Sequence, residues 1–167
     1  MGFLNFGLDE DSSMTNNDIL RRIRYCFDFS DPKMAALFSL ADHPITQDQI
    51  KDWLKKEEEP GYQELSDVLL ATFLNGLIND RRGKKEGEQP QPETCLTHNI
   101  IFKKLRIALD LKADDILEIL GLADVRLSKH ELSAFFRKPD HKNFRECKNQ
   151  VLRNFLKGLQ LKYRPGM

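Results

Sequence analysis

One short stretch late in the chain combines cationic side chains with an aromatic ring. Lysine and arginine bind phosphate groups, and an aromatic ring can stack on a base, so this combination is typical of nucleic-acid binding. A charged helix end of this kind also occurs simply as a solvated surface, and both interpretations stay open. The candidate binding residues are Arg137, Lys138, His141, Lys142, Phe144 and Arg145.

The sequence patterns that usually carry enzymatic or metal chemistry are missing. There is no HExxH zinc motif, no GxSxG nucleophile motif, no P-loop and no GxGxxG dinucleotide motif. The three cysteines, Cys26, Cys95 and Cys147, are odd in number and lack a CxxC spacing, which disfavours a disulfide framework and structural zinc. We therefore assign no catalytic residue, no metal ligand and no cofactor, and we favour a protein that is not an enzyme.

A second set of charged residues recurs at a fixed interval of 82 positions. In each copy an arginine and an aspartate are spaced as i and i+4, which allows an ion pair along one helix face. A repeated glutamate could accept from these arginines across helices, which would make a structural ion network. The alternative is an enzyme that uses these carboxylates in an unrecognised site. The network residues are Arg24, Asp28, Glu64, Arg106, Asp110 and Glu146.

The fixed interval reflects a duplication of the chain. Residues 17–78 align with residues 99–160 without a gap, and 14 of these 62 positions are identical. Many other pairs keep their apolar character with helical periodicity, so the shared pattern is mainly that of a core. Turn residues divide each copy into four segments. The sequence predicts an all-α fold, a tandem duplication of a four-helix unit packed about a pseudo-two-fold axis.

Helix-start signals recur at equivalent places in the two copies. Asn17 and Asn99 are natural N-caps for the first helix of each unit. Thr46 and Ser128 each begin a capping box, which predicts the start of the third helix. The fourth helix of each unit is the most hydrophobic. The first and fourth helices are expected at about 17–28, 66–81, 99–110 and 148–162.

Each copy places a glycine inside its hydrophobic fourth helix, at Gly76 and Gly158. A glycine in a helix interior costs about 1 kcal/mol relative to alanine, so its recurrence needs a structural reason. We expect the missing side chain to allow close helix packing across the pseudo-two-fold interface. The helices brought together there would be the two fourth helices, or a fourth and a first helix.

Composition divides the chain into two repeats and two polar segments. Residues 83–98 are rich in Gly, Pro, Gln and charge and have no apolar period, which predicts a mobile linker. Residues 1–15 do not form a signal peptide, and we expect a flexible tail or leader there. The repeats then occupy residues 16–82 and 99–164, and at this size we expect them to share one core.

The formal net charge of zero hides an uneven distribution. Residues 1–98 hold 11 Lys and Arg against 18 Asp and Glu, which gives −7, and residues 99–167 hold 15 against 8, which gives +7. The opposite charges could dock one repeat on the other, or the basic repeat could bind an external partner. No apolar run approaches the roughly 18 residues of a membrane span, so we expect no membrane partner. The cysteine usage fits a reducing cytoplasm, where we expect the protein to be.

Four stretches of the sequence match the pattern of a known family. They are Asn-Asp-Ile-Leu-Arg at 17–21, Phe-Leu-Asn-Gly-Leu-Ile at 73–78, Lys-Lys-Leu-Arg-Ile-Ala at 103–108 and Lys-Pro-Asp-His-Lys-Asn-Phe-Arg-Glu-Cys at 138–147. On these stretches, residues 14–164 resemble the bacterial YehS-like family, whose function is unknown. The resemblance implies a tandem helical protein of the bacterial cytoplasm, and it implies no activity, ligand or site residue.

We therefore consider three classes of function, from the most to the least favoured. The favoured class is a non-enzymatic interaction or regulatory module, because a scaffold is duplicated without any catalytic constellation. The alternative is binding of DNA or RNA through the basic second repeat. An enzyme with an unrecognised carboxylate site is third. The expected partner is thus another protein or a nucleic acid.

Overall fold

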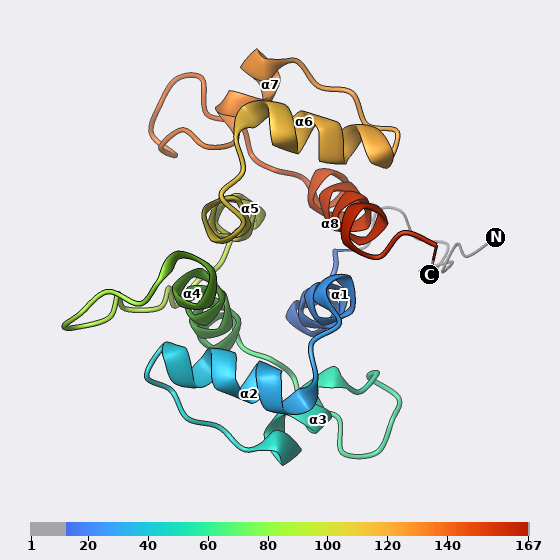
Figure 1. Ribbon diagram of the computed structural model, residues 1–167. Helices are drawn as coiled ribbons and strands as arrows, with labels where there is room; N and C mark the ends of the chain where they lie inside the picture. The colour runs from blue at the N-terminus through green and yellow to red at the C-terminus, as the bar shows by residue number, and fades with distance from the viewer. Residues whose placement is uncertain (1–12, 167) are drawn as a thin grey trace.

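The computed structural model describes residues 13–166, and within this range the chain forms eight helices and no strand (Figure 1). The predicted all-α fold is therefore confirmed. Residues 1–12, where most of the flexible tail was expected, and residue 167 lie outside the described residues. The helices are α1 (Asn16–Phe27), α2 (Asp31–Leu40), α3 (Gln47–Leu54), α4 (Asp67–Arg82), α5 (His98–Ala108), α6 (Ala113–Leu122), α7 (Lys129–Ala134) and α8 (Asn149–Tyr163).

The two halves of the chain repeat each other helix by helix. Helices α1 to α4 begin at residues 16, 31, 47 and 67, and α5 to α8 each begin 82 residues later. Figure 1 shows the predicted pseudo-two-fold arrangement, with α1 beside α8 and α4 beside α5 at the centre. The second and third helices of each repeat lie on opposite outer sides of this central group. Each first helix thus packs mainly along the fourth helix of the other repeat.

The core extends through both repeats. Buried apolar side chains from the two halves form one continuous cluster. In the first repeat the ring centroids of Phe38 and Phe73 are 5.5 Å apart, and in the second those of Phe102 and Phe155 are 4.6 Å apart. All four rings are fully buried. Because α1 and α5 bury their apolar faces partly against the other repeat, we expect neither repeat to fold alone.

The third helices begin where their sequence signals indicate. The hydroxyls of Thr46 and Ser128 accept from backbone N–H groups three residues later, and the side chains at those positions accept from the cap backbone in return. Both predicted capping boxes are therefore confirmed. Each one satisfies N–H groups that the first helical turn leaves without an intrahelical partner.

The N-caps of the first helices lie two residues before the predicted ones. The N-caps are Thr15 for α1 and Thr97 for α5, and their hydroxyls accept from backbone N–H groups within the first turn. The assignment of Asn17 and Asn99 as N-caps was therefore wrong. Both asparagines are buried inside the first turn, where their amides are available to other segments.

The repeated glycines lie where the fourth helix of each repeat crosses its own second helix. A Cβ atom added at Gly76 would stand 2.7 Å from the carbonyl carbon of Leu37 in α2, and one at Gly158 would stand 2.9 Å from that of Ile119 in α6. In both cases the carbonyl oxygen would be nearer still. The close packing therefore lies within each repeat, and its expected place at the pseudo-two-fold interface was wrong.

Four aspartates follow helix ends with the backbone in the left-handed region. Asp28, Asp42, Asp110 and Asp124 have φ angles of 52°, 58°, 53° and 62°, and no other non-glycine residue in 13–166 has a positive φ. Aspartate tolerates this region better than most residues because its short polar side chain can hydrogen-bond locally. The left-handed backbone conformation therefore explains why aspartate occurs at these positions in both copies.

Replacing Asp124 by valine is expected to destabilise the protein by about 1 to 2 kcal/mol, because a β-branched side chain is strained in the left-handed region. Asp124→Gly should be tolerated, since glycine adopts this conformation without strain. Asp124 is exposed, so neither change removes buried packing. Urea denaturation of the two variants measures the difference. Equal stabilities would contradict the backbone explanation.

The polar segments at the ends of the first repeat make specific contacts. In the segment before α5, Glu93 pairs with Lys104 of α5 at 3.0 Å. Met14 is buried, and its backbone N–H donates to Asn149 Oδ1 of α8 at 2.9 Å. Residues 14 and 15 therefore belong to the folded repeat and not to a tail. The mobility of the linker stays a prediction.

Candidate functional site

Two equivalent loops join the third helix of each repeat to the fourth. We call residues 55–66, between α3 and α4, the acidic loop, and residues 135–148, between α7 and α8, the basic loop. The acidic loop carries two Lys against four Glu, a net charge of −2. The basic loop carries five Lys and Arg against one Asp and one Glu, a net charge of +3. All six candidate binding residues lie on the basic loop.

A buried asparagine of the first helix holds each loop. Asn17 Nδ2 donates to the carbonyl oxygens of Trp53 and Gln63 at 2.9 and 2.8 Å, and Asn17 Oδ1 accepts from the N–H of Leu65 at 3.0 Å. Asn99 makes the same three bonds to the residues 82 positions later, at 3.0, 2.8 and 2.9 Å. Because buried backbone groups need partners, these bonds determine where each loop starts and ends.

The backbone turns inside the two loops also coincide. In the acidic loop the N–H groups of Glu59 and Tyr62 donate to the carbonyl oxygens three residues before them, at 2.9 and 3.2 Å. The N–H groups of His141 and Phe144 do the same in the basic loop, at 2.9 Å each. One backbone framework therefore presents a carboxylate in the first repeat and an imidazole in the second.

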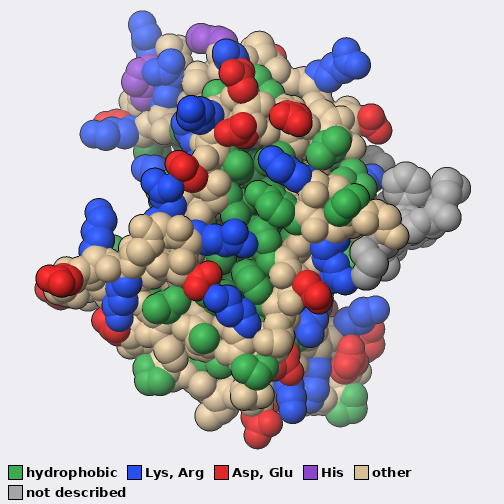
Figure 2. All heavy atoms as spheres, in the orientation of Figure 1, with side chains coloured by type: hydrophobic (Ala, Val, Ile, Leu, Met, Phe, Trp, Pro, Cys, Tyr) green, Lys and Arg blue, Asp and Glu red, His purple; other side chains and the backbone are tan. Residues whose placement is uncertain are grey.

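The basic loop turns its cations outward. Figure 2 shows Lys, Arg and His side chains gathered at the upper left of the molecule, over this loop. The Arg145 guanidinium is 4.0 Å from Glu131 Oε2, and its side chain is 63% exposed. The backbone of the same residue is held by Asn99. Lys138, His141, Lys142 and Arg145 are exposed, and Arg137 and Phe144 are partly buried.

The side chains of Arg137 and His141 lie next to each other on the basic loop. The N–H of Asn143 donates to His141 Nδ1 at 2.9 Å, so the neutral ring carries its proton on Nε2. That Nε2 atom is 3.4 Å from Arg137 Nη1, which is also a donor. Two donors cannot bond to each other, and this arrangement suits a shared acceptor such as a phosphate or carboxylate oxygen.

The two loops of opposite charge do not meet. Figure 1 places the acidic loop at the lower right and the basic loop at the upper left, at opposite corners of the molecule. Attraction between them therefore does not dock the repeats. Arg82 pairs with Asp110 at 3.0 Å and Arg164 pairs with Asp28 at 3.7 Å, and these equivalent pairs, 82 positions apart, join the repeats.

The predicted ion pairs along the first helices are wrong. Asp28 and Asp110 lie beyond the helix ends in the left-handed conformation, so their carboxylates leave the helix face. They pair instead with arginines of the other repeat, as just described. Arg24 Nε is 3.9 Å from Asp31, and Arg106 Nε donates to the carbonyl of Leu111 at 3.3 Å.

The repeated glutamates do not link helices either. Glu64 is exposed on the acidic loop, and Glu146 is exposed on the basic loop, where it pairs with Lys148 at 3.2 Å. Because the loops lie at opposite corners, these carboxylates cannot act together on one substrate. The alternative of an enzyme with an unrecognised carboxylate site stays a prediction.

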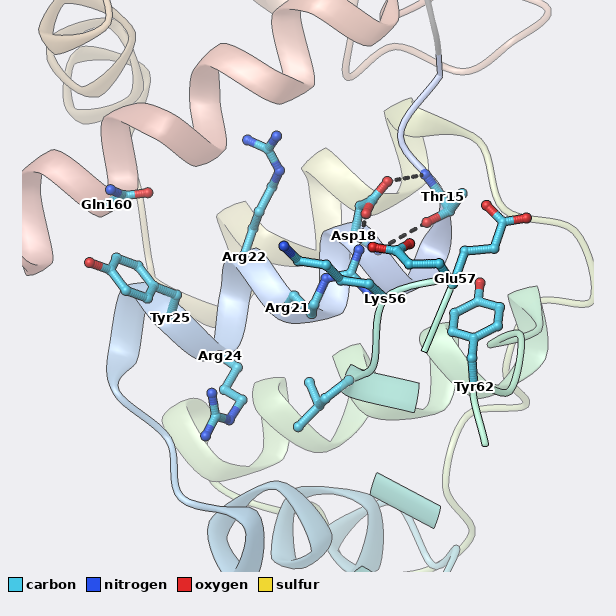
Figure 3. Close-up of a pocket in the computed structure, with 12 residues that line it drawn as sticks. Thr15, Asp18, Arg21, Arg22, Arg24, Tyr25, Lys56, Glu57, Tyr62 and Gln160 are labelled. Carbon is cyan, nitrogen blue, oxygen red and sulfur yellow. Dashed lines mark hydrogen bonds and ion pairs between the residues drawn. The ribbon is translucent and has the colours of Figure 1, made fainter. Parts of the chain in front are cut away.

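Sequence reasoning missed a cleft at the seam between the repeats. This seam cleft has a volume of about 610 Å³ and lies between α1, the acidic loop and α8 of the other repeat (Figure 3). Arg21 joins two of these walls, because it pairs with Asp18 of α1 and donates to the carbonyl of Lys55 at 2.8 Å. The residues that line the cleft come from several separate segments, so no sequence motif indicates the cleft.

Several titratable groups at this seam are perturbed. Burial lowers the pKa of the Arg22 guanidinium, and Arg153 of α8 lowers it further. Burial raises the pKa of Tyr62, and the nearby carboxylates of Glu57 and Glu64 act in the same direction. The phenol therefore stays protonated and can donate a hydrogen bond.

The buried cysteines are poorly suited to nucleophilic chemistry. Burial raises the pKa of both Cys26 and Cys147 to about 12, so their thiols stay protonated at neutral pH. Cys95 is exposed in the segment between the repeats. No group of three or more His, Cys, Asp or Glu side chains in the described part of the chain could hold a metal ion.

Comparison with known proteins identifies the family. The chain belongs to the family described as "Protein of unknown function (DUF1456)", whose model matches residues 16–83 and again residues 98–165. The two matches begin 82 residues apart, so each repeat is one copy of the family domain, and the predicted duplication is confirmed. No solved structure matches the chain.

A particular relative confirms the resemblance seen in the sequence. The uncharacterized protein YehS of Escherichia coli (strain K12) is 48% identical over 147 residues, which cover 87% of this chain and 94% of the relative. Neither the family description nor the relative's name states an activity. Between residues 13 and 166, every helix is too short or too polar to cross a bilayer.

Proposed function

We propose that this protein is a non-enzymatic interaction module of the cytoplasm and that it binds an anionic partner on the basic loop. One observation carries the proposal. Asn17 and Asn99 hold the two loops in the same backbone framework, yet the side chains on that framework have opposite charge. The fold therefore does not require the cations of the basic loop. Binding of an anionic partner would explain why they are there.

The geometry of the loop supports an anionic partner. Asn99 fixes the backbone at Phe135, Arg145 and Cys147, so the cations project from a preformed support and lose little entropy on binding. Arg137 Nη1 and His141 Nε2 lie 3.4 Å apart, so one acceptor can lie beside both. An oxyanion placed there would accept from both.

Nucleic acid is the second candidate partner, and Phe144 favours it. Its ring is only partly buried and lies on the same loop as Lys142 and Arg145. Cations beside an exposed aromatic surface fit a backbone phosphate and a stacked base together. An acidic protein surface would use the cations and not the ring.

Neutralising Lys138, Lys142 and Arg145 together as glutamines is expected to weaken binding of generic single-stranded RNA and duplex DNA. The slope of log K against log salt should fall by about 2 to 3, since each lost phosphate contact removes roughly 0.7 to 0.9. Fluorescence anisotropy at several salt concentrations measures this slope. The matched control replaces Lys51, Lys85 and Lys103, three exposed lysines elsewhere, by glutamine.

The outcome separates the two candidates. Binding that depends on the basic loop and not on the control lysines supports nucleic acid. Binding of poly-glutamate, but not of nucleic acid, through the same residues would indicate an acidic protein partner. If neither polyanion binds at low salt, or if both triple variants weaken binding equally, the proposal for the basic loop is wrong.

A further inference from the structure

Groups of opposite charge lie towards different ends of the seam cleft. In Figure 3, Tyr25 and Gln160 lie at one end, and Glu57 and Tyr62 lie at the other. Lys56 extends from the acidic loop over α1 towards the Tyr25 end, on the side of the cleft where Arg22 lies. One end of the cleft is therefore cationic and the other end anionic.

The floor of the cleft is held in place before any ligand arrives. The ion pair of Arg21 with Asp18 and its bond to the Lys55 carbonyl tie the acidic loop to α1. At the far end, the Arg164 guanidinium lies 4.3 Å from the centroid of the Tyr25 ring and donates to the Tyr25 carbonyl at 3.1 Å. A preformed cavity of about 300 to 1,000 Å³ is typical of small-ligand sites.

The second repeat shows that the fold does not demand these polar groups. At the positions 82 residues away, Tyr25 corresponds to Ile107, Glu57 to Pro139 and Tyr62 to Phe144. Gln160 of α8 corresponds in the same way to Ile78 of α4. The equivalent seam thus replaces these four side chains by apolar ones, whereas Lys56 and Glu58 correspond to Lys138 and Asp140. The hydroxyls of Tyr25 and Tyr62, the Gln160 amide and the Glu57 carboxylate are specific to the seam between α1 and α8.

A ligand that satisfies both ends must itself carry both charges. A carboxylate would accept from Lys56 Nζ, and an ammonium group would donate to the carboxylates of Glu57 and Glu58. The side chain of Leu54 also lines the cleft and offers an apolar contact. A wholly anionic ligand would be repelled by the glutamates, and a wholly cationic one by the Lys56 end.

We propose that the seam cleft binds a short peptide with free termini, with its carboxylate beside Lys56 and its ammonium group beside Glu57 and Glu58. This site is distinct from the basic loop and does not depend on the function proposed for it. The peptide bonds would face the hydroxyls of Tyr25 and Tyr62. Apolar side chains would lie over Leu54.

Isothermal titration of the full chain with leucyl-phenylalanine tests this proposal. The N-acetyl derivative lacks the ammonium group and the C-terminal amide lacks the carboxylate, so each should bind about tenfold more weakly than the parent dipeptide. A tenfold loss corresponds to the energy of one charge-assisted hydrogen bond.

Variants assign each end of the ligand. Glu57→Gln with Glu58→Gln should weaken the parent dipeptide about tenfold and leave the N-acetyl derivative unchanged, because that derivative has no ammonium group to lose. Lys56→Gln should weaken the parent and leave the amide unchanged. Asp140→Asn, at the position equivalent to Glu58, and Lys51→Gln on α3 are the matched controls. All five substituted positions are exposed, so the fold should persist.

The proposal would be overturned by three results. The first is no saturable heat with the dipeptide at millimolar concentration. The second is equal affinity for the parent and its two derivatives, which would mean that the termini are not recognised. The third is an equal loss of affinity in the control variants. Binding of nucleic acid to the basic loop can succeed or fail independently, because its residues lie at the opposite corner of the molecule (Figure 1).

Discussion

Asn17→Ala is expected to destabilise the protein by about 3 to 5 kcal/mol, which would lower the melting temperature by roughly 10 °C. The change removes three hydrogen bonds and leaves two carbonyl oxygens and one N–H without their partner, at 2.8 to 3.0 Å in the native structure. Buried polar groups that lose their partner cost about 1 to 3 kcal/mol each. Urea denaturation followed by circular dichroism measures the loss.

Two further variants separate the hydrogen bonds from packing. Asn17→Leu fills a similar volume but makes no hydrogen bond, so it should destabilise as much as alanine. Asn143→Ala, at an exposed position of the basic loop, should change stability by no more than about 0.5 kcal/mol. Full stability of Asn17→Leu would show that the amide is not what holds the acidic loop. Asn99→Ala should repeat the result in the second repeat, because its three bonds are equivalent.

Gly76→Ala is expected to cost about 3 kcal/mol, at the upper end of the range for overpacking a core. The added Cβ would stand 2.7 Å from the carbonyl carbon of Leu37, and that atom belongs to the backbone of α2 and cannot rotate away. The helices α2 and α4 must therefore separate, which opens the packing around both. Thermal denaturation and urea titration measure the effect.

Gly121→Ala provides the matched control, because this glycine lies in α6 with no other atom within 4 Å of an added Cβ. Alanine favours the helix by about 1 kcal/mol over glycine, so this variant should be more stable than the parent protein. Gly158→Ala should behave like Gly76→Ala, since its added Cβ would meet the backbone of Ile119. If all three variants changed stability in the same direction, the close helix crossing would not explain the repeated glycines.

Much of the fold could be predicted because local patterns determine it. The helical period of apolar residues and the turn residues indicated four helices in each copy, and the capping boxes at Thr46 and Ser128 located two helix starts. The duplication followed from alignment of the chain with itself. The caps of α1 and α5 were misplaced because Asn17 and Thr15 are both good cap residues, and only the structure shows which one the chain uses.

The candidate sites were less predictable. The basic loop was found because its cations lie close together in the sequence, and the structure adds that their support is Asn99, 36 positions before Phe135. The recurrence of asparagine at positions 17 and 99 was visible in the sequence, but it was interpreted as a pair of N-caps. The structure shows that both side chains hold a loop instead. The seam cleft had no signal, because Tyr25, Lys56 and Gln160 come from three distant segments.

The sequence by itself determined the helices, the duplication and the uneven charge, since periodicity, capping and composition act over a few residues at a time. The tertiary structure alone decided which surfaces meet. It placed Gly76 against its own second helix and paired Asp28 with Arg164 of the other repeat. It also sent the two charged loops to opposite corners. The physical reason is that an apolar stripe specifies which face of a helix is buried, but not which helix covers it.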